Sequence, residues 1–140
     1  MGRTHNQVDA THSYGQNYDG QEADSSLLSA GQSAWLPLLA QSPSFRCNIG
    51  ITNTGASTAN VTLALYDGQG NLLWSGNNES SALASGGFIQ YLTPFQKYGG
   101  RNDLEHAYAR VTVNSGSGII VWASVVDNAT GDPTTIFMKR

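Results

Sequence analysis

Short runs of alternating apolar and polar residues, separated by turn signals, fill the chain from about residue 32 onward. In segment 60–67, Val61, Leu63 and Leu65 alternate with polar or small neighbours. Residues two apart lie on the same face of a β-strand, so each such run predicts a strand with one buried face. Several short strands joined by turns are typical of an all-β domain.

The expected strands form an antiparallel β-sandwich of about seven to nine strands, immunoglobulin-like or jelly-roll in class. The expected segments are 32–40, 46–53, 60–67, 72–75, 81–92, 106–114, 119–126 and 134–138. Pro37 predicts that its strand lies at an edge or contains a bulge. Segment 93–105 can hold a short helical turn. We expect one domain, in which residues 32–140 form the core and residues 1–31 form a short strand and a long polar loop.

Composition limits the partners of this domain. Of the 140 residues, 39% are hydrophobic and only 12% are charged, and the net charge is −3. Without a cluster of Lys and Arg, nucleic-acid binding is not expected. No apolar run has transmembrane length, and no signal peptide opens the sequence, so we expect no membrane partner. Either the protein is cytoplasmic or it is a piece of a longer secreted protein.

The side chains of two predicted strands can be assigned to faces. In 106–114, four small or branched residues alternate with His106, Tyr108, Arg110 and Thr112, which should project from the opposite face. Segment 119–126 is apolar on both faces, so it should be a central strand with Trp122 in the core. Trp74 follows a hairpin and should be more accessible. Cys47 is the only cysteine and is interpreted as a small buried hydrophobe.

Four runs of sequence resemble the β-sandwich modules of large secreted bacterial proteins, namely 45–53, 108–113, 123–128 and 131–134. Those modules resemble immunoglobulin domains, repeat in tandem and are extracellular or periplasmic. The resemblance therefore implies a sandwich fold and an extracellular or periplasmic parent family. Arg3-Thr4-His5-Asn6 resembles a strand in the middle of the usual unit, so the chain is expected to begin partway through it. An exposed strand edge could then pair with another copy to form a homo-oligomer.

Two positions depart from the pattern of these modules. An aromatic residue is usual where His5 stands, and a small residue is usual where His106 stands. With His12, these are the three histidines of the chain. Three imidazoles with an open fourth position can hold a catalytic zinc ion and generate hydroxide at neutral pH. A small module with three histidines resembles a zinc-dependent phosphotriesterase-type enzyme.

The first functional hypothesis is therefore a zinc-dependent hydrolase. His5, His12 and His106 would bind zinc, and metal-bound hydroxide would attack an activated ester, phosphoester or phosphotriester. Asp9, Asp103 or Glu105 would orient the imidazoles, and Tyr108 or Arg110 would stabilise developing negative charge. The spacing of His5 and His12 matches no local zinc motif, and three unrelated surface histidines are the simpler interpretation.

The second hypothesis is a non-catalytic module for adhesion, carbohydrate binding or spacing. The chain has three tryptophans and several tyrosines, and some of these rings could provide flat surfaces on which sugars stack. A serine hydrolase is not favoured, because no G-x-S-x-G motif occurs. The Asx-rich segment 127–132 lacks the spacing of an EF-hand loop, so a turn explains it better than a calcium site.

Overall fold

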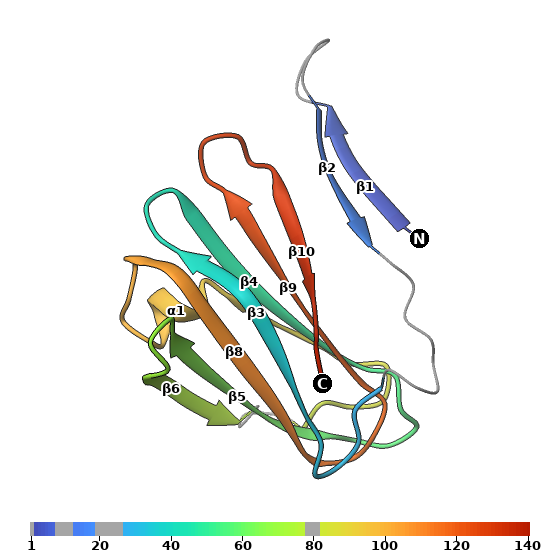
Figure 1. The fold of residues 1–140 in the computed structure, drawn as a ribbon. Helices are drawn as coiled ribbons and strands as arrows, with labels where there is room; N and C mark the ends of the chain where they lie inside the picture. Colours follow the sequence, from blue (N-terminus) through green and yellow to red (C-terminus); the bar gives the residue numbers. More distant parts are fainter. Residues whose placement is uncertain (1, 8–12, 19–26, 78–81) are drawn as a thin grey trace.

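A computed structural model describes residues 2–7, 13–18, 27–77 and 82–140 (Figure 1). For the first two of these ranges the description covers the backbone. The strands are β1 (Gly2–Gln7), β2 (Ser13–Tyr18), β3 (Ser33–Gln41), β4 (Phe45–Asn53), β5 (Asn60–Asp67), β6 (Leu72–Asn77), β7 (Phe88–Leu92), β8 (Leu104–Ser115), β9 (Ile119–Asp127) and β10 (Pro133–Phe137). A single-turn helix, α1 (Pro94–Lys97), connects β7 to β8.

Two antiparallel four-stranded sheets form the sandwich, which confirms the expected fold class. One sheet has the order β10-β9-β4-β7 and the other has the order β3-β8-β5-β6. Strand β9 is central, as its apolar faces predict. Strands β1 and β2 pair as a separate ribbon that lies alongside β10 (Figure 1).

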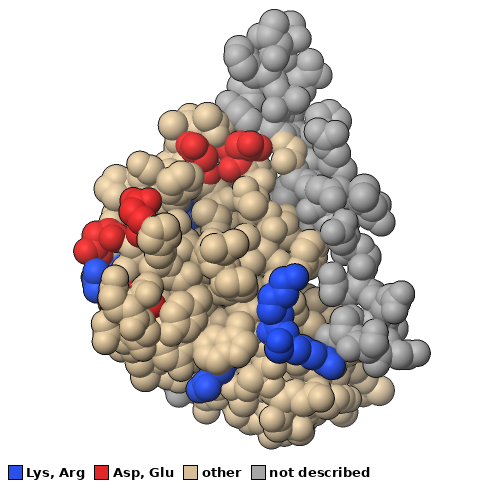
Figure 2. Space-filling view, in the orientation of Figure 1, with Lys and Arg blue, Asp and Glu red and all other residues tan. Residues whose placement is uncertain are grey.

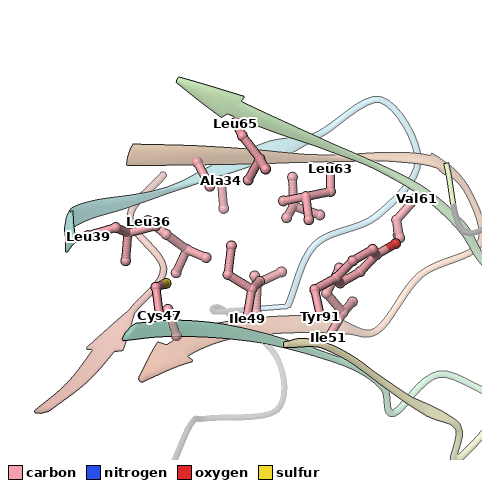
Figure 3. Packing of buried hydrophobic residues seen from close by; sticks show 14 of the residues in the cluster. Ala34, Leu36, Leu39, Cys47, Ile49, Ile51, Val61, Leu63, Leu65 and Tyr91 are labelled. Carbon is pink, nitrogen blue, oxygen red and sulfur yellow. The ribbon is translucent and has the colours of Figure 1, made fainter. Parts of the chain in front are cut away.

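The core lies between the sheets and is built from the alternating apolar residues of both (Figure 3). Leu63 and Leu65 of β5 face Ile49 and Ile51 of β4, and all four side chains are fully buried. Burying a large aliphatic side chain contributes about 1.5–3 kcal/mol to folding. Cys47 is buried in the same layer, as predicted. Burial among apolar side chains raises the pKa of its thiol to about 12.

A buried amide joins the loops at one end of the sandwich. Asn53 is fully buried, and its Nδ2 donates hydrogen bonds to the carbonyl oxygens of Ser57 and Leu83, each at 2.8 Å. Its Oδ1 accepts a hydrogen bond from the backbone N–H of Gly55 at 2.9 Å. One side chain therefore holds the β4–β5 loop to the segment before β7, and it satisfies its own polar atoms by doing so.

Strand β3 contains the irregularity that Pro37 predicts. It is an edge strand, and its pairing with β8 passes from Leu36↔Ala109 to Leu39↔Ala107, which leaves one extra residue on β3. Leu38 absorbs this bulge with a left-handed φ of 58°, and its side chain is 80% exposed. A proline cannot donate to the ladder, and a bulge removes the need for a donor there.

Three sequence-based expectations are wrong in detail. The run 81–92 forms a strand only from Phe88, because Gly86 adopts a φ of 73° and the chain turns there. The expected polar loop of residues 7–31 contains strand β2. Trp122 is half-buried on the outer face of its sheet rather than in the core.

Candidate functional site

Strand β8 carries the side chains that define the candidate site. Its residues Ala107, Ala109 and Val111 point into the core. The alternating residues His106, Tyr108, Arg110 and Thr112 therefore lie on the outer face of the sheet β3-β8-β5-β6, as predicted. His106 is exposed, whereas Tyr108 and Arg110 are half-buried.

Three aromatic side chains pack around the middle of this outer face. Tyr66 and Tyr108 are register partners on β5 and β8, and their rings stack with centroids 5.0 Å apart and planes 7° from parallel. Trp35 of β3 lies 5.7 Å from the Tyr108 ring and 6.1 Å from the Tyr66 ring, tilted against both. Such contacts hold all three rings in place on the sheet surface.

Arg110 extends this aromatic cluster with a positive charge. Its guanidinium carbon lies 5.4 Å from the centroid of the Trp35 ring, in a cation–π contact. The Nε atom of Arg110 is buried and has no hydrogen-bond partner among the described residues. A buried N–H without an acceptor costs free energy.

A pocket of about 330 Å³ adjoins the cluster. Trp35, Pro37 and Leu38 supply apolar surface, and His106 and Tyr108 supply polar groups. The bulge at Leu38 therefore has a local consequence, because it places an exposed leucine beside the imidazole of His106. Gly68, Ala107 and the residues just named complete the lining.

The hairpin between β5 and β6 forms part of the pocket wall through Gly68. Asp67 accepts hydrogen bonds from the backbone N–H groups of Gln69 and Asn71 at 3.0 and 2.9 Å, and from Asn71 Nδ2 at 2.8 Å. The Asn71 side chain and these backbone donors hold the pKa of Asp67 below its ordinary value. A Cβ atom at Gly68 would lie 3.0 Å from the carbonyl oxygen of His106, so the absence of a side chain allows this close approach.

The structure describes the predicted zinc ligands and carboxylates to different extents. His12 and Asp9 lie outside the described residues, and His5 lies on β1, where only the backbone is described. Glu105 is exposed beside His106. Asp103 is engaged elsewhere, since it accepts hydrogen bonds of 2.6 and 3.0 Å from Arg101. The part of the chain with described side chains contains no group of three residues suited to hold a metal ion.

The ribbon and the start of β8 lie on different sides of the sandwich. In Figure 1, β1 and β2 run beside β10, whereas β8 begins next to α1 at the opposite side. Within one chain, the fold therefore gives β1 and the beginning of β8 no shared sheet.

Charged side chains are sparse on the face of the molecule that Figure 2 shows. In Figure 2, red side chains gather along the upper and left rim of the visible face, and blue side chains form small groups lower down. Most of that face is tan and therefore uncharged.

Among the described residues, no helix is long and apolar enough to cross a membrane.

Comparisons with protein-family models, curated proteins and solved structures found no match for this chain. The functional argument therefore rests on the side chains of the site. Sequence reasoning identified His106, Tyr108 and Arg110 as neighbours on one face. It named Trp35 and Tyr66 only as possible stacking residues for sugars and did not place them, or Leu38, beside β8, since that depends on which strands are paired.

Proposed function

We propose that this chain is a zinc-dependent hydrolase of activated esters or phosphoesters, phosphotriesters included, and that its substrate lies in the pocket beside His106. One observation supports the proposal most strongly. The exposed imidazole of His106 lines an apolar pocket, and the guanidinium of Arg110 lies on the same face of the same strand.

The pocket suits an aromatic leaving group. Trp35, Pro37 and Leu38 offer an apolar wall for an aryl ring, and removing such a ring from water contributes to binding roughly in proportion to the apolar area buried. Tyr108 adds a phenol hydroxyl at the edge of the same wall. Activated aryl esters combine an apolar ring with a reactive carbonyl or phosphoryl group, and this lining can accommodate both parts.

Arg110 would act on developing negative charge. Its guanidinium is held against Trp35, so little reorganisation of this side chain is needed when an anionic oxygen forms. In this proposal Arg110 donates to the oxygen that gains charge, and Tyr108 donates beside it. Glu105 and Asp9 orient the imidazoles that bind the metal.

The imidazole of His106 can serve as a zinc ligand, because it is exposed and imidazole nitrogen binds zinc. Zinc, when bound by histidines, supplies Lewis acidity and a nucleophile at neutral pH. The proposal assigns the other ligands to His5 and His12. Because β1 lies away from the start of β8 in Figure 1, the ribbon of a second copy would have to bring these two histidines to His106. The proposed enzyme is therefore a homo-oligomer.

Complementation between inactive variants tests this arrangement. One variant carries His106→Ala and keeps the ribbon, and the other carries His5→Ala with His12→Ala and keeps His106. If the site forms between two copies, mixing the variants after reversible dissociation restores zinc-dependent hydrolysis of a 4-nitrophenyl ester or phosphotriester, to about a quarter of the parent rate for a randomly mixed dimer.

Two results would contradict the proposal. Hydrolysis that persists in the His106→Ala variant would place the chemistry elsewhere. A mixture that stays inactive, while each variant assembles as the parent does, would refute the shared site. Asp132→Asn, on the remote β9–β10 turn, serves as a control that should leave the rate unchanged.

A further inference from the structure

Leu38 is a leucine whose backbone conformation and exposure both cost free energy. Its φ of 58° lies in the left-handed region, where a side chain crowds the following carbonyl oxygen and glycine or asparagine is the usual residue. Leu38 is also 80% exposed, so burial in the core does not offset this cost. The packing of the sandwich therefore does not explain a leucine at this position.

Thr93 shows how the fold accounts for a similar backbone conformation elsewhere. It is the other non-glycine residue with a positive φ among the described residues, at 43°. Its backbone N–H donates a hydrogen bond to Asn48 Oδ1 at 3.2 Å, and its carbonyl oxygen accepts hydrogen bonds from the N–H groups of Gln96 and Lys97. The start of α1 therefore holds Thr93 in place. At Leu38 the bulge explains the turn of the backbone, but it does not explain the choice of leucine.

The bulge turns Leu38 from the core side of β3 to the pocket side. Residues two apart share a face in a regular strand, so Leu38 would otherwise point into the core with Leu36. Instead the buried residues are Leu36 and Leu39. Pro37 and Leu38 together lie opposite Tyr108 in the register of β3 with β8. Leu38 consequently lines the pocket.

From this geometry we infer that Leu38 determines the specificity of the site for an aryl group. Together with Trp35 it supplies apolar surface from the same strand. The pocket of about 330 Å³ has room for one substituted ring, since a cavity of about 150 Å³ already holds benzene. A short alkyl group would leave much of this apolar surface in water, so an aryl group should be favoured. The inference rests on the proposed function, because it takes the aryl group of that substrate as the occupant of the pocket.

Binding of 4-nitroanisole tests Leu38 without any hydrolysis, since this neutral aryl ether contains no ester. We expect equilibrium dialysis of the full chain, with a chelator present, to show one bound molecule per pocket. Leu38→Asn should weaken binding about tenfold, because an amide of similar size replaces the apolar wall. Leu38→Gly, which removes the side chain, should weaken it at least as much.

The melting temperature separates this effect from a loss of folding. Asparagine and glycine adopt a positive φ more readily than leucine, so both variants should melt no lower than the parent. Leu92→Asn is the matched control, since Leu92 is a 57% exposed leucine on β7 of the other sheet. This control should bind 4-nitroanisole as the parent does.

Two acetate esters test specificity in the zinc-loaded protein. Phenyl acetate and hexafluoroisopropyl acetate have leaving groups of similar acidity, but only the first has an aromatic ring. The ratio of their kcat/KM values should favour phenyl acetate in the parent, and Leu38→Asn should reduce this ratio about tenfold. The rate with the fluoroalkyl ester should change little.

The outcomes distinguish this inference from the proposed hydrolase. No binding of 4-nitroanisole by the folded parent, or equal binding by the parent and Leu38→Asn, would overturn the inference. Zinc-dependent hydrolysis with an unchanged ester ratio in Leu38→Asn would overturn it and leave the hydrolase in place. Binding that depends on Leu38, in a protein without zinc-dependent hydrolysis, would support the role of Leu38 in an aryl site and contradict the hydrolase.

Discussion

The indole of Trp122 lies across Gly50, so closely that a Cβ atom at position 50 would be 2.5 Å from Cε2 of the ring. The two residues are register partners on β9 and β4, in the centre of one sheet. A rigid ring in this position makes glycine a packing requirement of the sheet rather than a source of flexibility.

Gly50→Ala should therefore destabilise the protein by about 1–3 kcal/mol, the usual cost of forcing extra atoms into a packed position. Urea unfolding of four proteins measures this effect: the parent, Gly50→Ala, Trp122→Leu and the double variant. In the Trp122→Leu background, Gly50→Ala should cost much less, because the ring that it displaces is gone. Equal costs in both backgrounds would show that the ring does not exclude a side chain there.

The buried thiol of Cys47 should make stability fall at alkaline pH. Its pKa is about 12 in the folded protein, against an ordinary value of 9.0. Between these values the unfolded chain loses the thiol proton and the folded chain keeps it, so the free energy of unfolding falls as pH rises. The slope is about 1.4 kcal/mol per pH unit.

Cys47→Ala isolates this contribution, because the two proteins differ only at the thiol. The stability difference between parent and variant should be constant below pH 9 and should shrink as the pH rises above it. A difference that is independent of pH up to 11 would contradict the buried position of the thiol. Thiol reagents should also modify Cys47 only when the chain unfolds.

Asn53→Ala should cost about 2–4 kcal/mol, because it removes three hydrogen bonds made by a fully buried amide. Asn114→Ala is a matched control: its exposed amide donates to Asn60 Oδ1 at 2.9 Å and to Thr62 Oγ1 at 2.8 Å, where water can replace it. We expect the control to cost less than about 1 kcal/mol. Similar losses in the two variants would mean that burial of Asn53 does not matter.

Arg110→Met should lower kcat/KM for ester hydrolysis about 100-fold, if Arg110 stabilises developing charge as proposed. The methionine side chain can still cover Trp35, so the melting temperature should change little. Arg110→Lys should recover only part of the rate, since an ammonium group lacks the planar fork of the guanidinium. An unchanged kcat in the methionine variant would remove Arg110 from the mechanism.

Local pattern was sufficient to predict most of the sandwich. The alternation in 60–67 and 106–114 corresponds to the buried faces of β5 and β8, and Pro37 marks a bulged edge strand. The local pattern gave a wrong prediction for Trp122. An apolar run predicts burial, but it does not show which face of the strand a second sheet covers. Only the pairing of β9 with β4 shows that Trp122 lies over Gly50 on the outside.

The candidate site could be predicted only in part, for a related reason. His106, Tyr108 and Arg110 belong to one strand, so their shared face follows from the period of two. Trp35 and Tyr66 reach the same place through pairing across about 75 and 40 residues of sequence, and no local signal encodes that pairing.

Zinc content tests the central claim most directly. Elemental analysis of the purified protein, equilibrated with zinc at neutral pH and freed of excess metal, should find close to one zinc ion per chain. The His106→Ala variant should lose it, and Asp132→Asn should retain it. No bound zinc in the parent, or equal zinc in the His106→Ala variant, would contradict the account of the site.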